Sequence, residues 1–277
     1  MCNQHLKITR FFPILLILFF ISCHEIEYDP NSLFESDEEF QYKTEKAFCQ
    51  NDPEFEISSK NFYYNKNGNK TEEITYSFGN PVFKITITYN SYNQKLSESV
   101  FYYKNDSWEL STQNLYKYSR NRLIEKNNYD SGETLLNKTI YKYSDNRLKY
   151  EELYRRGNND WVFNFAYGYE YNSSGQLAKR LSYQDEAKEI VYDQYVYTYT
   201  DGRLATVKRI LVTGKTQFFR EYSYTRNGLL DEITEDGNTI EKNYYEHGKL
   251  IEKHTWYFGI DPGFFSCNGN YILKYGY

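Results

Sequence analysis

The sequence has 277 residues, with 32 Tyr, 19 Phe and 3 Trp, a mean hydropathy of −0.81 and a formal net charge of −5. The low hydropathy excludes a protein with several membrane-spanning helices, each of which needs about 20 consecutive apolar residues, and the high aromatic content argues against a disordered chain. The acidic pI of about 5.6 and the lack of a Lys/Arg stripe exclude a nucleic-acid partner.

Residues 1–22 are predicted to be a secretory signal peptide. Two basic residues precede the apolar run 11–21, which is too short to span a bilayer. The run ends in Phe20-Ile21-Ser22-Cys23, which resembles the lipobox of bacterial lipoproteins, with Phe20 where that family usually has Leu. The resemblance implies that cleavage leaves Cys23 as an acylated N-terminus whose palmitate-type chains tie the mature protein to a membrane. An ordinary signal peptide with a coincidental Cys is the alternative.

Residues 23–56 are predicted to be a lipidated acidic tether. Between residues 24 and 56, 11 acidic residues face two basic ones, whereas the chain from residue 57 onward is close to neutral. An acidic stretch with little periodicity is typical of a solvated linker. Its cluster Glu35-Ser-Asp-Glu-Glu39 is similar to the acidic export tags of some surface-displayed Bacteroidetes lipoproteins, which implies an outer-membrane location in the bacterial envelope. A tether that only needs solubility is the alternative.

Residues 57–258 repeat one pattern, in which a Tyr-x-Tyr pair is followed by a turn and then by Leu. Six copies begin at Tyr116, Tyr141, Tyr169, Tyr197, Tyr222 and, in shortened form, Tyr245, and a weaker copy surrounds Tyr89. Alternation along a strand places both tyrosines on one face, and the Asp-Gly, Asn-Gly or Ser-Gly that follows is typical of a tight hairpin turn. Each copy is therefore predicted to be a β-hairpin whose return strand starts at the Leu, followed by a second turn. No window sustains a helical period, so the segment is predicted to be all-β.

The repeat also carries a family resemblance. The pattern Tyr-x-Tyr-(Asp/Asn/Thr/Ser)-x-x-Gly-x-Leu, clearest at 197–204 and 171–177, resembles the YD (RHS) repeat over residues 60–258. Large members of that family form a spiralling β-sheet shell that encloses a toxin or presents a binding surface. This chain has few units, a longer period and no C-terminal toxin domain. We therefore expect an antiparallel β-hairpin array that forms a curved meander, a β-solenoid or a spiral sheet, because one hairpin alone cannot offset its ordering entropy.

Two cysteines remain once Cys2 is removed with the signal peptide and Cys23 is lipidated. These are Cys49, before the first repeats, and Cys267, in the divergent segment 259–277 that is predicted to cap the array. An even pair in an exported protein favours a disulfide. Two free thiols at separate ends of an elongated molecule are the alternative.

The sequence holds no motif that indicates catalysis. The mature chain has three histidines, His24, His247 and His254, and they do not have the spacing of a zinc protease. Neither a Gly-x-Ser-x-Gly elbow nor a phosphate-binding glycine loop occurs. We therefore expect no enzyme, no metal site and no cofactor.

The tryptophans are the candidate ligand-binding residues. Trp108 and Trp161 each follow an Asn/Asp turn and precede the next tyrosine pair by eight residues, and Trp256 precedes the predicted cap. A Trp beside a turn offers a stacking platform for a sugar or for a side chain of a partner. Packing of the ring against the neighbouring unit is the alternative. The sequence thus favours a non-catalytic binding or adhesion module for a glycan or protein of the envelope, or else a structural or accessory subunit with no ligand of its own.

Overall fold

The computed structural model describes residues 43–50, 52–158, 160–256 and 270–277. Within these ranges the chain forms 18 β-strands, and none of it forms a helix that is long and apolar enough to cross a membrane. The first nine strands are β1 (Thr44–Cys49), β2 (Asp52–Tyr64), β3 (Lys70–Ser77), β4 (Asn80–Tyr89), β5 (Lys95–Lys104), β6 (Ser107–Ser119), β7 (Arg122–Asp130), β8 (Leu135–Ser144) and β9 (Arg147–Arg156). The others are β10 (Trp161–Tyr171), β11 (Leu177–Tyr183), β12 (Val191–Thr200), β13 (Arg203–Leu211), β14 (Thr216–Tyr224), β15 (Leu230–Glu235), β16 (Asn238–Glu246), β17 (Lys249–Trp256) and β18 (Asn270–Gly276).

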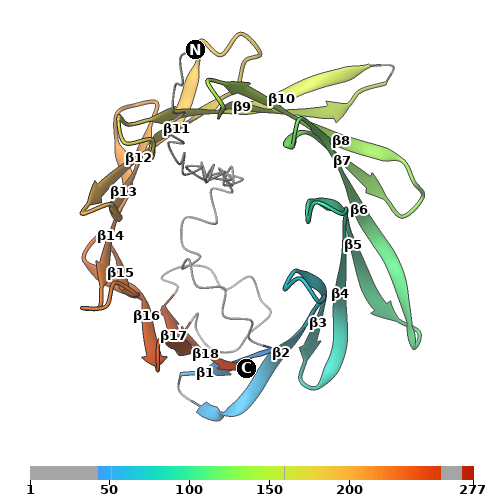
Figure 1. Cartoon of the computed structure of the whole chain (residues 1–277), viewed down its shortest axis with the longest axis vertical. Helices are drawn as coiled ribbons and strands as arrows, with labels where there is room; N and C mark the ends of the chain where they lie inside the picture. Colours follow the sequence, from blue (N-terminus) through green and yellow to red (C-terminus); the bar gives the residue numbers. More distant parts are fainter. Residues whose placement is uncertain (1–42, 51, 159, 257–269) are drawn as a thin grey trace, which may run out of the picture. The chain divides into compact units, whose positions relative to one another are not determined.

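The strands form one closed sheet (Figure 1). Each strand pairs antiparallel with the strands before and after it in the chain, and β18 returns to pair with β1. The all-β antiparallel prediction is therefore confirmed. The expected curved meander is found, but it closes on itself into a barrel, so the predicted solenoid or spiral sheet is wrong. The repeat pattern records only the pairing of neighbouring hairpins, whereas closure depends on the twist and stagger accumulated over all 18 strands.

The barrel also takes in more of the chain than the repeat pattern covers. β1 and the start of β2 lie within the predicted tether 23–56, and β18 lies within the predicted cap 259–277. Acidic residues in this part of the chain serve as ion-pair partners between strands, as in the 2.8 Å contact between Glu56 and Lys46. An acidic composition therefore does not distinguish a solvated linker from a charged strand pair.

The hairpin turns fall where Asn, Asp and Gly predict them. Asn105-Asp106 joins β5 to β6 and Asp236-Gly237 joins β15 to β16, with positive φ at both residues of each turn. This is the backbone conformation that a two-residue turn needs to match the twist of its strands. The predicted two-turn unit is thus confirmed.

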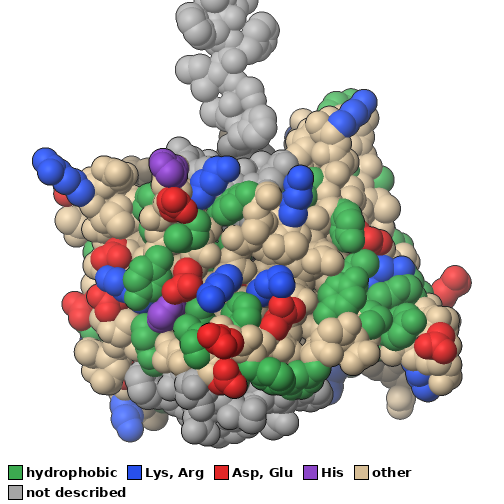
Figure 2. Space-filling view, turned by 90° about the horizontal axis from the view of Figure 1, so that it is seen from below, with side chains coloured by type: hydrophobic (Ala, Val, Ile, Leu, Met, Phe, Trp, Pro, Cys, Tyr) green, Lys and Arg blue, Asp and Glu red, His purple; other side chains and the backbone are tan. Residues whose placement is uncertain are grey.

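The two faces of the sheet differ in burial. The face that carries the tyrosine pairs and the Leu after each turn also holds most of the buried apolar residues, including Phe62, Ile87, Leu123, Leu148, Tyr169, Leu177, Tyr197, Leu204, Val207, Tyr222 and Ile233. Side chains converge on the concave side of a barrel, so we assign this face to the inside and call it the inner face. Figure 2 shows the outside over the strands at the bottom of Figure 1, where charged, histidine and apolar side chains are mixed. This is the outer face.

In most of the described units the second tyrosine of the pair ties its hairpin to the preceding one. Its hydroxyl donates to the backbone carbonyl of the first or second residue of the previous return strand, and a β-bulge disrupts the ladder beside that acceptor residue. The described bonds, 2.6 to 2.9 Å long, join Tyr89 to Lys70, Tyr143 to Leu123, Tyr171 to Leu148, Tyr199 to Leu177, Tyr224 to Leu204, Tyr245 to Leu230 and Tyr277 to Leu250. Burial raises the pKa of Tyr199 and of Tyr245 to about 12, so these hydroxyls stay protonated donors at neutral pH.

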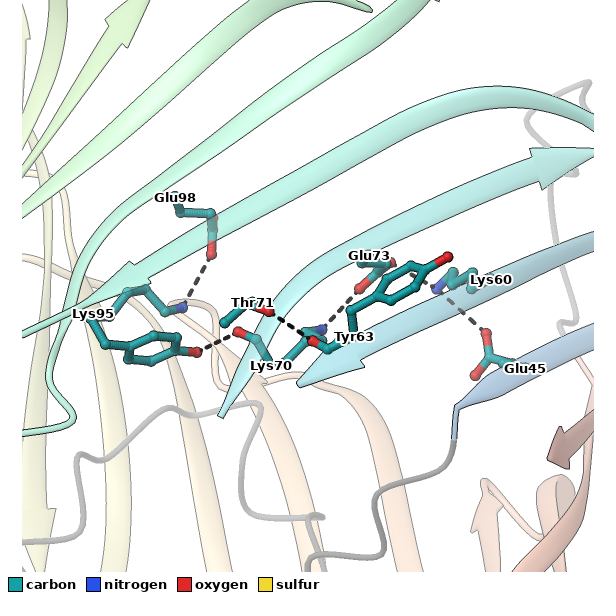
Figure 3. A network of polar contacts seen from close by, with 9 residues as sticks. Glu45, Lys60, Tyr63, Lys70, Thr71, Glu73, Lys95 and Glu98 are labelled. Atoms are coloured by element: carbon teal, nitrogen blue, oxygen red, sulfur yellow. Dashed lines mark hydrogen bonds and ion pairs between the residues drawn. The ribbon is translucent and has the colours of Figure 1, made fainter. Parts of the chain in front are cut away.

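A basic residue next to that Leu covers the same tyrosine ring. The pairs are Arg122 over Tyr143 at 5.5 Å, Arg147 over Tyr171 at 5.4 Å, Arg203 over Tyr224 at 5.7 Å and Lys249 over Tyr277 at 4.8 Å. Figure 3 shows the corresponding region of the first units, where Lys60, Lys70 and Lys95 form ion pairs with neighbouring glutamates. Four units thus contribute both a carbonyl and a cation to the tyrosine of the next.

The turns gather at two rims. The turns that follow the tyrosine pairs form the tyrosine rim, at 65–69, 90–94, 120–121, 145–146, 172–176, 201–202, 225–229 and 247–248. The opposite end, where β6 and β10 begin, is the tryptophan rim. Neighbouring turns of the tyrosine rim are bridged, for example by the Gln176 Nε2 donor to the Gly202 carbonyl at 2.8 Å. The described chain enters the barrel at this rim, where the Lys43 N–H donates to the Gly276 carbonyl.

The seam between β1 and β18 has a small core of its own, formed by Ala47, Cys49, Ile57, Tyr271 and Leu273. Cys49 is disulfide-bonded, and its partner is not among the described residues. The predicted partner, Cys267, lies outside them, so this pairing stays a prediction. Tyr271, which is opposite Cys49 in the register, follows Cys267 by four residues.

Replacing Tyr171 with Phe tests the tyrosine contact. The change removes the hydroxyl that bonds Leu148 while the ring stays, so we expect the free energy of unfolding to fall by about 1 kcal/mol with an unchanged urea m-value. Tyr92→Phe is the matched control, because Tyr92 is 75% exposed in a turn of the same rim. Equal effects of the two substitutions would contradict the proposed role of the hydroxyl.

Candidate functional site

The three tryptophans lie at one end of the barrel and on one face. Trp108 is the second residue of β6, Trp161 is the first of β10 and Trp256 is the last of β17, so all three are at the tryptophan rim. The strand registers pair Trp108 with Tyr103 and Trp161 with Arg156, and they place all three rings on the outer face.

Trp108 is part of an aromatic and basic cluster. Its ring meets the Tyr103 ring edge-on, with centroids 5.0 Å apart, and Tyr103 is 36% exposed. The Lys84 ammonium lies 5.0 Å from the Trp108 centroid and 4.8 Å from that of Phe101. One cation therefore covers two rings on the outer wall.

Trp161 has a similar neighbourhood on other strands. The Lys138 ammonium lies 4.7 Å from the Trp161 centroid and 5.3 Å from that of Tyr154, and the Arg156 guanidinium lies 6.0 Å from Trp161. Tyr154 in turn meets the Phe163 ring edge-on at 5.8 Å. The aromatic and basic combination seen at Trp108 thus recurs.

Trp256 differs in its partners. Its ring centroid is 5.9 Å from that of His254, which itself lies 4.9 Å from Tyr244. His254 Nε2 is 2.6 Å from a carboxylate oxygen of Glu252. Here the neighbour of the indole is an imidazole rather than a lysine or arginine.

The structure does not bring the three tryptophans together. β6, β10 and β17 pair only with their own sequence neighbours, so the rings belong to three separate places around the wall. Each ring is half-buried. This burial is intermediate between that of an exposed stacking platform and that of a ring packed against the neighbouring unit, the two alternatives that the sequence leaves open.

A buried carboxylate beside the Trp161 cluster could not be found from the sequence. Glu152 of β9 is 1% exposed on the outer face. Its carboxylate lies 2.8 Å from the Lys142 ammonium and 2.7 Å from that of Lys188, and it accepts a 3.0 Å hydrogen bond from the Tyr154 hydroxyl. These partners come from β8, from β9 itself and from the loop between β11 and β12, so no local pattern marks the cluster.

The loop that carries Lys188 is held in place at both ends. Within it, the Asp185 carboxylate accepts hydrogen bonds from the backbone N–H groups of Glu189 and Ile190, which lower the pKa of Asp185. Glu186 reaches the Tyr154 hydroxyl at 3.3 Å. The loop thereby folds over the outer face at Glu152 and Tyr154.

Two opposing effects act on Glu152. Burial raises the pKa of its carboxyl, but hydrogen bonds from Lys142, Lys188 and Tyr154 together outweigh that effect, so the pKa lies below the ordinary value of 4.5. Burial and the neighbouring carboxylate raise the pKa of Tyr154. Glu152 is therefore ionised at neutral pH and holds two lysines and a phenol donor.

The remaining predicted residues are placed as follows. Cys23 and Cys267 lie outside the described residues, while His247 sits in the turn between β16 and β17 and His254 on β17. Within the described part of the chain, no group of three His, Cys, Asp or Glu side chains has the arrangement of a metal site.

No protein-family model and no curated protein sequence matches the chain. Among solved structures, it is similar to a porin-like protein from Bacteroides uniformis, with 10% identity over 84% of this chain and 95% of that one and a TM-score of 0.48. It is also similar to the TcdB2–TccC3 complex (15% identity, 72% of this chain, TM-score 0.38) and to the Tc holotoxin pore of Photorhabdus luminescens (13% identity, 76%, TM-score 0.39). The chain spans 13% of the length of each Tc toxin chain. These similarities carry no information on function, because every TM-score is below 0.5.

Replacing Glu152 with Gln is expected to lower the free energy of unfolding at pH 7 by about 2 kcal/mol, because two lysines lose their shared carboxylate. A carboxyl whose pKa is depressed in the folded state stabilises the fold above its unfolded pKa, and this contribution is lost as the pH falls through the folded pKa. The difference between wild type and variant should therefore shrink below about pH 4 in urea titrations. The control is Glu170→Gln, whose ion pair with Lys179 is exposed and should contribute little at any pH. A pH-independent difference would contradict the assignment.

Proposed function

We propose that this protein is a lipid-anchored module of the bacterial cell envelope that binds an extended glycan, without catalysis, through the aromatic and basic clusters of its tryptophan rim. The observation that carries the proposal is the recurrence of one arrangement: three half-buried indoles on the same face and at the same end, two of them beside a lysine. An indole stacks on the C–H face of a sugar, and the adjacent ammonium donates hydrogen bonds to its hydroxyls.

The path of the chain supports an orientation in which the tryptophan rim points away from the membrane. A tether that starts at an acylated Cys23 would reach the barrel at the tyrosine rim, where the Lys43 N–H bonds the Gly276 carbonyl at 2.6 Å. Trp108 and Trp161 are at the other end of their strands. A barrel anchored in this way presents the tryptophan rim away from the membrane.

The charge on both faces supports a barrel that stands in water. Ion pairs lie along the strands of the inner face, as between Arg209 and Asp193, and of the outer face, as between Lys117 and Glu125 at 2.6 Å. A barrel that spans a bilayer instead presents an outward apolar band about 25 Å tall. This charge distribution supports a protein that is held at the envelope surface by its lipid anchor.

A structural or accessory subunit is the second candidate. Its support is the contact that each indole makes with its own wall, as between Trp108 and Tyr103, which is the arrangement expected if the rings serve only to pack hairpins together. Such a subunit would need no ligand of its own.

Replacing Cys23 with Ser tests the anchor. We expect the variant to lose incorporation of a palmitate analogue and to move from the membrane fraction to the soluble fraction, because the thiol is the only acceptor for the first acyl chain in the lipobox resemblance. Cys2→Ser is the matched control, since that Cys lies within the predicted signal peptide. Undiminished labelling of the Cys23→Ser protein would rule out the anchor.

Replacing Trp161 or Trp108 with Ala tests the binding surface. The probe is polysaccharide extracted from the envelope of the producing bacterium, and we expect each variant to bind it at least tenfold more weakly, with loss of the ligand-induced shift in tryptophan fluorescence. Tyr92→Ala is the control, because it removes an exposed ring from the opposite rim. Unchanged binding together with a lowered urea midpoint would support the structural subunit instead, and a wild type that does not bind the polysaccharide would contradict the glycan proposal.

A further inference from the structure

A row of alternating arginine and aromatic side chains crosses the inner face, away from the tryptophan rim clusters. The register aligns Arg180 of β11 with Tyr195 of β12, Tyr195 with Arg209 of β13, and Arg209 with Phe218 of β14. These four side chains therefore lie on one line across four adjacent strands, on the same face as Tyr167.

Arg180 is held between two rings. Its guanidinium carbon lies 4.2 Å from the Tyr195 centroid and 4.8 Å from the Tyr167 centroid. A planar guanidinium that stacks through its faces keeps its N–H groups in the plane between them, and that fork matches a carboxylate in a bidentate manner. Stacking thus fixes the direction of the Arg180 N–H donors before a carboxylate ligand binds.

The neighbouring arginines on this face each bind a carboxylate. Arg209, which also lies over Tyr195, grips the Asp193 carboxylate through Nε and Nη2. Arg220 bonds Glu235 through Nε at 2.7 Å. Within the described part of the chain, no carboxylate meets Arg180, and its Nε is buried without a hydrogen-bond partner.

A second unsatisfied atom lies in the same row. Asp193 is 3% exposed, and Arg209 takes only its Oδ2, which leaves Oδ1 buried without a hydrogen-bond partner among the described residues. Buried polar atoms are nearly always bonded, and the exceptions call for an explanation. A donor and an acceptor are therefore both unsatisfied in one aromatic row.

We propose that Arg180, Tyr195 and Asp193 form a binding site for a uronic-acid unit of an acidic glycan. The guanidinium of Arg180 takes the sugar carboxylate as a fork, the aromatic rings flank the sugar ring, and Asp193 Oδ1 accepts a sugar hydroxyl. The site faces the inside of a barrel of 18 strands, a strand number at which barrels are wide enough to hold solvent and solutes. It shares no residue with the tryptophan rim clusters and stands independently of the function proposed for them.

The test uses the full-length protein in detergent and isothermal titration with tetragalacturonate, and separately with a mannuronate tetramer. The control ligand is the methyl ester of tetragalacturonate, which has the same sugar rings without the charge. We expect the acid to bind and the ester to bind at least thirtyfold more weakly, with affinity falling as NaCl rises. Equal binding of the acid and the ester would overturn the proposal, and so would the absence of binding of either uronate at millimolar concentration. These two outcomes need only the wild-type protein.

Two substitutions then locate the site. Arg180→Met keeps the stem but removes the fork, so uronate binding should fall at least thirtyfold. Arg180→Lys keeps the charge but loses bidentate geometry and stacking, so it should still lower the uronate affinity about tenfold.

Arg226→Met, at an exposed turn position, is the matched control. Trp161→Ala should bind the uronate like wild type, which separates this site from the proposed glycan surface. Unchanged affinity of folded Arg180→Met would place the uronate elsewhere and sink the assignment.

Discussion

In most of the described units the hydroxyl of the second tyrosine in the pair bonds a carbonyl of the preceding hairpin, and the rest of the barrel depends on that contact. A single hairpin lacks the buried surface to fold, so its order must come from its neighbour. The bond recurs from Tyr89 to Tyr277, next to a bulge that disrupts the ladder. In four units the adjacent cation covers the same ring, so that one tyrosine joins two hairpins by hydrogen bonding, stacking and burial together.

The local structure could be predicted from the sequence, because its signals are local. The spacing of Tyr197 and Tyr199, the turn at Asp201-Gly202 and the return strand that begins beside Leu204 all lie within eight residues, and the structure has a hairpin there. Closure could not be predicted, since the pairing of β1 with β18 joins Thr44 to Gly276 and has no counterpart in the repeat.

The candidate sites were only partly accessible to sequence reasoning. The tryptophans stand out by composition, but their common face depends on bulges such as the one between Phe163 and Phe165, which shift the alternation within β10. Glu152 and Arg180 stand out only through partners on other strands and loops. A charged residue on a polar strand looks ordinary until its cross-strand neighbours are known, and those neighbours follow from the register rather than from the motif.

Closure also limits how such a protein can change over evolutionary time. An open array can grow by one hairpin and simply acquire a new last strand. In a ring whose neighbours are all antiparallel, the strand count must stay even, so duplication or loss has to involve whole hairpins and alters the circumference at once. Every such event would have to preserve the meeting of the first and last strands, so related barrels should differ in loop length far more readily than in girth.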